Sequence, residues 1–217
     1  MGARVAWIFS GGDPPAPLAI EALTPPDVIL AADSGVEHAL TLGCRVNLVV
    51  GDLDSADPAA LDAAVAGGAA LERYPVAKEA TDLELAFAAA RAQKCGRVIV
   101  IGGHGGRLDH LLGNALLFAS PDFADLRVEA RMGDADVVVV RDLAELHGDV
   151  GDLCSLVPVG GPATGVRTQG LRFPLHGEVL HPGSTRGISN ELLEPVAQVA
   201  LERGVILAVL PHARKAL

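Results

Sequence analysis

The most informative stretch of this sequence is LVVGDLDS at residues 48–55. A short apolar run ends at Gly51, and two aspartates, Asp52 and Asp54, follow one residue apart. Two carboxylates this close repel each other, so both stay ionised only if a cation or a hydrogen-bond donor lies between them. Such oxygen ligands suit Mg²⁺, which takes one or two carboxylates and shares its shell with water and phosphates. The alternative is a helix cap, since Asp57-Pro58 also resembles a helix start.

Short apolar runs alternate with alanine-rich amphipathic segments through the first two thirds of the chain. The runs predict strands at Val5–Phe9, Val28–Ala32, Leu48–Val50, Val98–Ile101 and Val137–Val140. The segments between them predict helices at about Ala16–Leu23, Ser34–Leu42, Pro58–Ala66, Asp82–Cys95 and Asp109–Ala119. Strands that alternate with helices indicate an α/β fold, with a mainly parallel sheet and helices on both faces.

The character of the chain changes near Gly148, after which glycine, proline and short strands dominate. Strands are predicted at Cys154–Pro158, Gly165–Thr168, Leu171–Leu175, Glu191–Ala200 and Val205–Leu210. The segment Glu202-Arg203-Gly204 predicts a hairpin turn between the last two of them. We therefore expect an α/β domain over residues 1–147 and a small antiparallel β domain over residues 148–217.

Composition limits the classes of function that are open to this chain. Half of the 217 residues are hydrophobic, which suffices for a full core, and the formal charge of −10 argues against a nucleic-acid binder. A polyphosphate ligand would have to arrive with a divalent metal. The three cysteines are far apart, which is typical of reduced thiols in a cytoplasmic protein. The chain has no signal peptide pattern and no apolar stretch near the roughly 20 residues of a membrane span.

Polar motifs follow nearly every predicted strand of the first domain. Ligands of open α/β sheets bind beyond the carboxyl ends of the strands, so these motifs are candidate site loops. The motifs that follow strands are SGGD at 10–13, DSG at 33–35, GDLDS at 51–55 and GGHGGRLDH at 102–110. A further motif, KEATD at 78–82, opens the long predicted helix on what should be the same side. The alternative for Asp33 or Ser34 is that it is simply a helix N-cap. Thr81 and Glu84 form a capping-box pattern, and Asp82 would favour the helix dipole whatever else it does.

The glycine-rich loop at residues 102–106 is the strongest candidate for binding an anion. Four glycines in five positions expose backbone N–H groups, and a helix start follows them. Arg107 adds a fork that can grip two phosphate oxygens. The alternative is a flexible loop. Little in the sequence favours a functional role for His104, and His110 is expected to pack or hydrogen-bond locally rather than to catalyse. Because no Walker-type lysine motif exists, phosphate charge must be met by Arg107, Lys78, backbone amides and metal.

Taken in order, five motifs resemble those of bacterial thiamine pyrophosphokinases (thiamine diphosphokinases). They are DSG at 33–35, GDLDS at 51–55, KEATD at 78–82, GGRLDH at 105–110 and GISN at 187–190. The resemblance covers essentially the whole chain. It implies an α/β ATP-binding domain followed by a β-sandwich domain that contributes to thiamine binding and dimerisation. It also implies transfer of pyrophosphate from ATP to the hydroxyl of thiamine, with Mg²⁺, giving thiamine diphosphate and AMP.

The resemblance also implies a role for each matching position. The metal-binding carboxylates would be Asp52, Asp54 and Asp82, and the catalytic residues would be Asp54, Asp82, Asp109 and Arg107. The nucleotide contacts would be Asp33, Ser34, Lys78, Thr81, Gly105, Gly106 and Arg107. Ser189 and Asn190 would bind thiamine, facing the nucleotide site of the partner subunit in a homodimer.

Three departures from the family pattern stand out. Ser34 and Glu79 occupy positions where the family often has glycine and aspartate. The single tryptophan, Trp7, lies in the first predicted strand, so an aromatic platform for thiamine cannot be a tryptophan of the β domain.

Other classes fit the motifs less well. In haloacid-dehalogenase-type phosphatases the Asp-x-Asp motif closes the first strand and a threonine follows, whereas here it follows the third strand and Ala56 takes that place. An Asp-x-Asp nucleotide-sugar transferase has no use for the GGRLDH loop. A non-enzymatic nucleotide sensor would need neither a dense carboxylate cluster nor an acceptor site.

Overall fold

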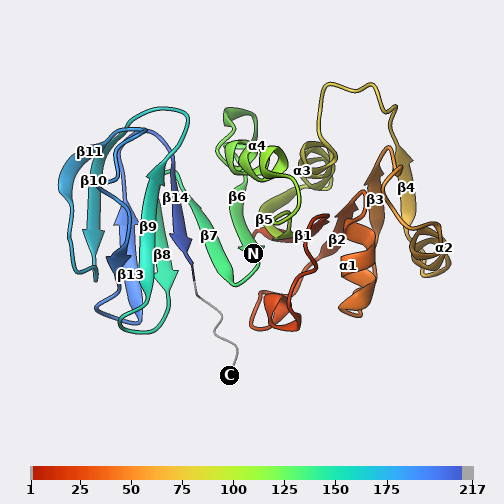
Figure 1. The fold of residues 1–217 in the computed structure, drawn as a ribbon, viewed down its shortest axis with the longest axis horizontal. Coiled ribbons are helices and arrows are strands. Elements are labelled where there is room, and N and C mark those ends of the chain that lie inside the picture. Colours follow the sequence, from red (N-terminus) through yellow and green to blue (C-terminus); the bar gives the residue numbers. More distant parts are fainter. Residues whose placement is uncertain (1, 212–217) are drawn as a thin grey trace. The chain divides into compact units, whose positions relative to one another are not determined.

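The computed structural model describes residues 2–211, which pack into two units (Figure 1). The first unit comprises residues up to Leu117 together with Asp125–Gly133. The second comprises Phe118–Ala124 and the residues from Asp134 onward. No helix within residues 2–211 is long and apolar enough to cross a membrane.

A parallel sheet forms the centre of the first unit. Its described strands are β1 (Arg4–Ser10), β2 (Val28–Ala32), β3 (Leu48–Gly51), β4 (Ala70–Arg73), β5 (Cys95–Gly102) and β6 (Arg127–Met132), in the order β6-β5-β1-β2-β3-β4. Every adjacent pair is parallel, and Trp7 of β1 lies between Ile29 and Ile99. The strand order reverses at β1, which is where open α/β sheets bind their ligands.

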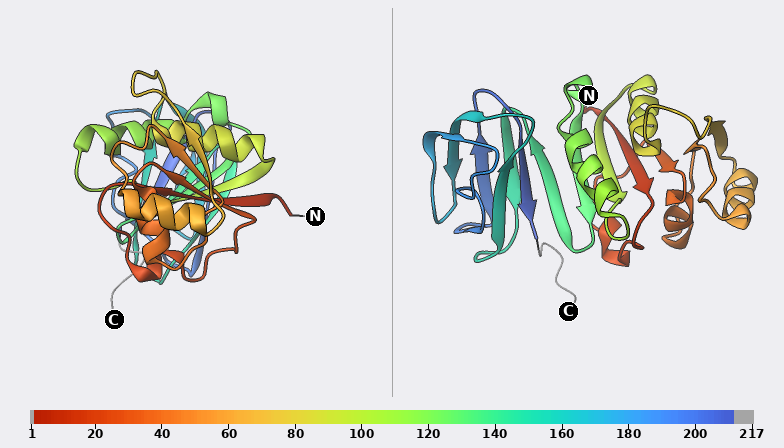
Figure 2. Two further views of the ribbon diagram at one scale, coloured as in Figure 1. Left: turned by 90° about the vertical axis from the view of Figure 1, so that its right-hand side faces the viewer. Right: turned by 45° about the horizontal axis from the view of Figure 1, so that its top comes forward.

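Helices cover both faces of this sheet (Figure 2). The helices are α1 (Gly35–Thr41), α2 (Pro58–Ala66), α3 (Asp82–Ala92) and α4 (Leu108–Phe118). Val36 of α1 and Leu61 of α2 share one core cluster with Phe9. Strand side chains alternate between faces, so residues such as Ile8 point to the other side, where Phe87 of α3 is buried. The predicted α/β fold is confirmed.

Several predicted boundaries in this unit are wrong. The predicted helix at Ala16–Leu23 is only a short 3₁₀ turn, Pro17–Ile20, because prolines flank it and Ala22 adopts a φ of 59°. The helix predicted to run to Cys95 ends at Ala92, since Lys94 adopts a φ of 61° and β5 begins at Cys95. Strands β4 and β6 were not predicted: β4 is exposed along its length, and β6 carries three charged residues.

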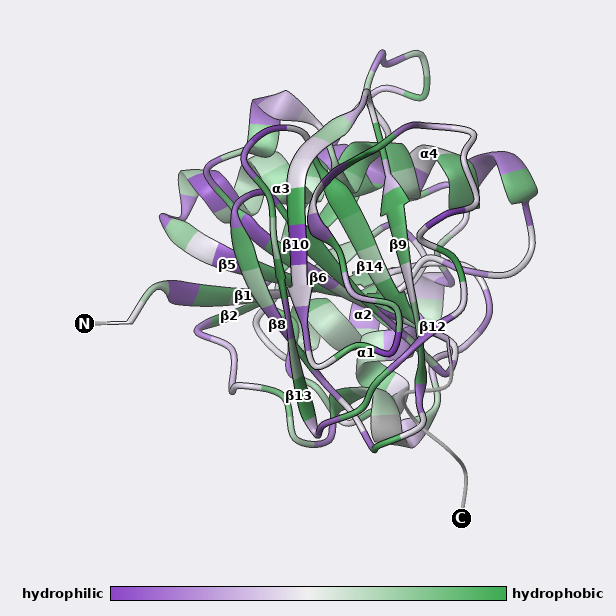
Figure 3. Cartoon of the chain, turned by 90° about the vertical axis from the view of Figure 1, so that its left-hand side faces the viewer, coloured by the Kyte–Doolittle hydropathy of each residue, from purple (hydrophilic) through white to green (hydrophobic). Residues whose placement is uncertain are grey.

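The second unit is an antiparallel β-sandwich. Its described strands are β7 (Ala135–Val140), β8 (Leu143–His147), β9 (Leu153–Pro158), β10 (Ala163–Gln169), β11 (His176–Leu180), β12 (Asn190–Glu191), β13 (Val196–Ala200) and β14 (Ile206–Leu210). They pair in the orders β12-β9-β14-β7 and β11-β10-β13-β8. Leu146, Leu156, Val166 and Ile206 form one core between the two layers. Figure 3 shows β14 as apolar along its length, in keeping with its burial.

The predicted hairpin at Glu202-Arg203-Gly204 is wrong. β13 pairs with β10 and β8, whereas β14 pairs with β9 and β7, so this turn carries the chain from one layer of the sandwich to the other. The strand predicted at Leu171–Leu175 is replaced by β11, which begins at His176. The run predicted as Glu191–Ala200 is two strands, because Pro195 interrupts it.

The units divide the chain earlier than the predicted domains do. Packing changes from the first unit to the second between Gly133 and Asp134, and Val140, Ala144 and Leu146 belong to the core of the second unit. The division into an ATP-binding domain over residues 1–147 and a thiamine-binding domain over residues 148–217 concerns function and stays a prediction.

Candidate active site

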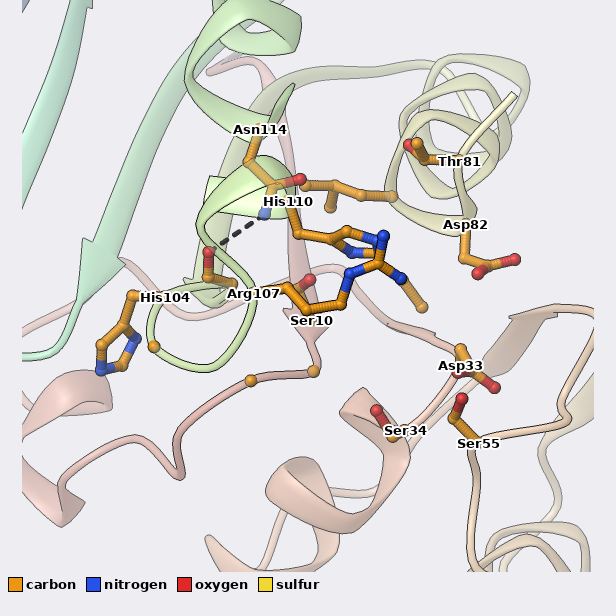
Figure 4. A pocket seen from close by; sticks show the side chains of 16 residues that line it. Ser10, Asp33, Ser34, Ser55, Thr81, Asp82, His104, Arg107, His110 and Asn114 are labelled. Atoms are coloured by element: carbon orange, nitrogen blue, oxygen red, sulfur yellow. Dashed lines mark hydrogen bonds between the residues drawn. The ribbon is translucent and has the colours of Figure 1, made fainter. Parts of the chain in front are cut away.

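A pocket of about 280 Å³ opens at the carboxyl ends of the central strands of the first unit. It lies at β1, β2 and β5, where the strand order of the sheet reverses. Its walls come from four polar loops and the starts of α3 and α4 (Figure 4). The lining residues include Ser10, Asp33, Ser34, Ser55, Thr81, Asp82, Gly105, Arg107, His110 and Asn114. Polar side chains that lie far apart in the sequence therefore share one cavity.

The glycine-rich loop of the pocket is held in place by hydrogen bonds. The backbone N–H of Asp13 donates to His104 O at 2.8 Å, and Gly103 N–H donates to Gly11 O at 3.0 Å. The amide nitrogen of the buried Asn114 donates to Gly103 O at 3.0 Å. His104 accepts a hydrogen bond from Gly133 N–H at Nδ1, at 3.1 Å. These hydrogen bonds hold the glycine-rich loop as a preformed cradle for an anion.

Gly105 is required in this cradle. Its φ is 73°, and a Cβ at this position would overlap the carboxylate of Asp13, with every carboxylate atom within 2.4 Å. Only glycine combines that backbone conformation with so close an approach.

Three carboxylates meet beside the cradle. Asp33 follows β2, Asp52 follows β3, and Asp82 opens α3, and one oxygen from each lies within 4.8 Å of the others. Gly51 makes room for them, since a Cβ on Gly51 would lie 2.7 Å from Asp82 Oδ1. Asp33 adopts a φ of 47°, which aspartate tolerates better than most residues.

Lys78 partly neutralises this cluster. Its Nζ donates to Asp52 Oδ2 at 2.5 Å and lies 3.0 Å from Asp82 Oδ1. The hydrogen bond from Lys78 lowers the pKa of Asp52. Burial alone would lower the pKa of Lys78, but the attraction of Asp52 and Asp82 raises it on balance. The Lys78 ammonium and the Asp52 carboxylate therefore stay charged together.

The cluster fits a divalent cation. Asp33 Oδ1 is buried and has no hydrogen-bond partner among the described residues, while the buried Asp82 Oδ1 has the ammonium of Lys78 at 3.0 Å. Burial, followed by the repulsion of Asp82, Asp52 and Asp54, raises the pKa of Asp33. Carboxylate oxygens are among the ligands that Mg²⁺ takes in proteins. Asp33, Asp52 and Asp82 would hold the ion.

The grouping differs from the predicted metal set in one member. Asp33 lies in the cluster, whereas Asp54 is exposed and accepts a hydrogen bond from Ser55 Oγ at 3.1 Å. Between the two aspartates of the motif, Leu53 is buried and adopts a φ of 63°. A metal-binding role of Asp54 stays a prediction.

Arg107 and Asp109 lie at the start of α4 and form a two-pronged ion pair. Arg107 Nε donates to Asp109 Oδ1 at 3.1 Å and Nη2 donates to Oδ2 at 2.6 Å. The hydrogen bond from Arg107 lowers the pKa of Asp109. In Figure 4, Arg107 and His110 extend from the start of α4 toward the side of the pocket that holds Asp33 and Asp82. The fork predicted for phosphate is thus exposed and already paired.

The helix starts keep two further predicted residues at the pocket. Thr81 is the N-cap of α3, where its Oγ1 accepts from Glu84 N–H at 3.2 Å. Ser34 is at the N-cap position of α1 but makes no capping hydrogen bond, so its hydroxyl is not used up by the helix. Sequence analysis named Ser10 only as part of the SGGD loop and missed Asn114. The signal for Asn114 was a single amide within the apolar run of α4.

Ser189 and Asn190 belong to the second unit. The buried Asn190 side chain donates from Nδ2 to Phe173 O at 2.8 Å and accepts at Oδ1 from Phe173 N–H at 3.0 Å. Ser189 adopts a φ of 57°, and its N–H donates to Ser155 Oγ at 3.1 Å. Phe173 itself is 63% exposed. Asn190 therefore fixes the backbone that carries an exposed aromatic ring.

We expect Gly51→Ala to destabilise the first unit by about 3–4 kcal/mol, because it adds a clash with Asp82 to a φ of 147° that favours glycine. Gly43→Ala is the matched control, since Gly43 also has a positive φ but has open space around its Cβ position. It should cost about 1–2 kcal/mol. Urea unfolding followed by circular dichroism measures both, and equal losses would contradict the predicted clash.

Comparison with known proteins agrees with this geometry. Residues 21–130 match the family model of the thiamin pyrophosphokinase catalytic domain, and residues 143–206 match that of the thiamin pyrophosphokinase vitamin B1 binding domain. Thiamine pyrophosphokinase of Bacillus subtilis is 23% identical over 182 residues, covering 83% of this chain and 85% of its own. The match to thiamine pyrophosphokinase 1 of rice is 26% identical over 117 residues and spans 52% of this chain but 44% of the rice protein.

Solved structures share the fold. A crystal structure of the Bacillus subtilis thiamine pyrophosphokinase superposes with a TM-score of 0.83 at 21% identity, covering 98% of this chain and 100% of that one. The thiamin pyrophosphokinase of Geobacillus thermodenitrificans superposes with a TM-score of 0.79 at 24% identity, covering 98% and 99%. Because the catalytic-domain model alone covers half of its length, the chain belongs to the thiamin pyrophosphokinase family.

Proposed function

We propose that this protein transfers pyrophosphate from ATP to the hydroxyl of thiamine, giving thiamine diphosphate and AMP. The observation that carries the proposal is the cluster of Asp33, Asp52 and Asp82 beside the glycine-rich cradle, in the unit that matches the catalytic-domain model. A carboxylate cluster next to an anion cradle is what a metal-bound polyphosphate needs. Mg²⁺, when bound, supplies the positive charge that stabilises the transferred group.

The chain's own residues would bind and align the nucleotide. Backbone N–H groups of Gly105 and Gly106, and the start of α3 at Thr81, would meet phosphate oxygens. Arg107 would add its fork once it exchanges Asp109 for phosphate. Phosphoryl transfer depends mainly on alignment and electrostatics, so a dedicated general base is not required.

Overall charge supports a metal-dependent reaction. The chain carries a formal charge of −10, and ATP is a polyanion, so the two repel each other without a cation. Thiamine carries a positive thiazolium ring, which an acidic cleft attracts. The same acidity that opposes free ATP therefore favours the acceptor.

We place thiamine binding in the second unit, at the segment that includes Ser189 and Asn190. Asn190 would act through the loop that it holds, because both ends of its amide already bond the backbone of Phe173. The exposed ring of Phe173 is an aromatic surface that does not depend on a tryptophan. Ser189, in its left-handed conformation, leaves its hydroxyl available to a ligand.

The protein is proposed to work as a cytoplasmic homodimer, with each active site completed by the partner subunit. A stripe of exposed leucines on α4 supports a second copy of this chain as the partner. Leu108, Leu112 and Leu116 recur every four residues along that helix and are all exposed. Covering them would remove an apolar surface from water.

The reaction itself is the first test. Incubated with thiamine, ATP and Mg²⁺, the protein should form thiamine diphosphate and AMP in equal amounts, and EDTA should stop the reaction. Phosphorus NMR and mass analysis separate AMP from ADP. ADP as the sole nucleotide product, or turnover that does not depend on thiamine, would disprove the proposed activity.

Asp54→Asn tests the predicted metal ligand that lies outside the cluster. We expect turnover to be abolished while the free energy of unfolding changes by no more than about 0.5 kcal/mol, because Asp54 is exposed. Asp62→Asn removes the same charge from the exposed face of α2 and should leave both unchanged. A near-normal rate of Asp54→Asn would show that Asp54 holds no metal.

Asn190→Ala tests the proposed role of Asn190 in thiamine binding. It should raise the KM for thiamine far more than the KM for ATP, because the Phe173 loop loses its anchor; Phe173→Ala should do the same. An equal effect on both KM values would separate Asn190 from thiamine.

Mixing two variants tests whether each active site is shared between the subunits of the dimer. Refolding Asn190→Ala together with Asp54→Asn should restore part of the activity, because one site of the mixed dimer combines two intact halves. No recovery, despite exchange of subunits, would show that each site lies within one chain.

A further inference from the structure

Lys78 lies on two of the carboxylates that the proposed metal site uses. Its Nζ is 2.5 Å from Asp52 Oδ2 and 3.0 Å from Asp82 Oδ1. The side chains of Lys78 and Asp52 are only 12% and 11% exposed. This is therefore a largely enclosed ion pair, in which each charge depends on its partner far more than in a surface salt bridge.

An ammonium and a divalent ion cannot share these oxygens. Mg²⁺ takes its oxygen ligands at about 2.0–2.1 Å. Bound to Asp52 Oδ2 and Asp82 Oδ1, the ion would need the space that Lys78 Nζ occupies between them. The two cations would also repel each other at that distance. Metal binding therefore requires the ammonium to leave.

Lys78 is able to leave and has somewhere to go. Its charge sits on a flexible four-carbon stem, which can swing without moving the backbone. It precedes the N-cap of α3 by three residues, and Thr81 and Asp82 of that helix start line the pocket. An ammonium released from the carboxylates is thus close to the edge where the phosphates of a nucleotide would lie.

We propose that Lys78 is an exchangeable counter-ion of the metal site. It neutralises Asp52 and Asp82 in the nucleotide-free protein, and it moves to the phosphates when Mg²⁺ arrives with ATP. This inference rests on the proposed function. Metal alone must displace Lys78 without offering it a new partner, whereas metal together with nucleotide offers one. Each ligand therefore strengthens the binding of the other.

Mn²⁺ titration followed by electron paramagnetic resonance tests the exchange without any turnover. In the absence of nucleotide, Lys78→Met should bind Mn²⁺ about tenfold more tightly than the wild type, because the competing charged hydrogen bond is gone. Lys94→Met is the matched control, since it makes the same change at an exposed position after α3, and its Mn²⁺ affinity should equal that of the wild type. With a non-hydrolysable ATP analogue present, the advantage of Lys78→Met should disappear.

Thermal unfolding gives a second measurement. In EDTA, Lys78→Met should have a lower Tm than Lys94→Met, because the three carboxylates lose their cation. Mn²⁺ should raise the Tm of Lys78→Met more than that of the wild type, as tighter binding requires. Lys78→Arg keeps the charge and should bind Mn²⁺ as weakly as the wild type. Tight binding by Lys78→Arg would overturn the exchange even if Lys78→Met does not fold.

The outcomes distinguish the exchange of Lys78 from the metal site of the proposed function. If wild type and Lys78→Met bind Mn²⁺ with equal affinity, the exchange is wrong and the proposed metal site stands. If none of the proteins binds Mn²⁺, even with the ATP analogue, the metal site of the proposed function is wrong and the exchange fails with it.

Discussion

The first unit depends on how it tolerates the mutual repulsion of Asp33, Asp52 and Asp82. Two like charges 4 Å apart oppose each other by about 4 kcal/mol at an effective dielectric constant of about 20, and these three carboxylates offer oxygens within 4.8 Å of one another. Lys78 offsets part of this repulsion with one positive charge on Asp52 and Asp82. Asp33 Oδ1 still has no hydrogen-bond partner among the described residues. The proposed metal ion would supply the remaining positive charge.

The backbone around the cluster bears the cost of bringing these carboxylates together. Asp33 and Leu53 both have positive φ, and Gly51 has a φ of 147° that leaves no room for a Cβ beside Asp82. Non-glycine residues rarely adopt such conformations unless the surrounding structure holds them, and they gather at functional sites. Here the surrounding structure is the parallel sheet, because Asp33 and Gly51 lie at the ends of the adjacent strands β2 and β3. The strained backbone at these positions and the close approach of the carboxylates therefore both follow from the pairing of β2 with β3.

Local patterns predicted much of this fold, and long-range pairing accounts for what they missed. The strands β1, β2 and β3 are apolar runs that end in polar turns, and Thr81 marks the start of α3 through its cap. The turn at residues 202–204 resembles a hairpin in every local respect, yet its two strands belong to different layers. Spacing also predicted Asp52 and Asp54 together as metal ligands, but the carboxylate cluster includes Asp33, which follows the neighbouring strand, and not Asp54. Asn114 was missed because its partner, Gly103 O, lies across a loop.

The two units use buried polar groups in different ways, and the difference bears on the proposed reaction. In the first unit, Asp33 Oδ1 has no hydrogen-bond partner among the described residues, so it would be available to the proposed metal ion. In the second unit, the buried amide of Asn190 is bonded at both ends to the backbone of Phe173. A contribution of Asn190 to thiamine affinity must therefore pass through the shape of the loop that it holds. Recognition of thiamine would rest on a rigid aromatic surface, while recognition of ATP would rest on exchangeable charge.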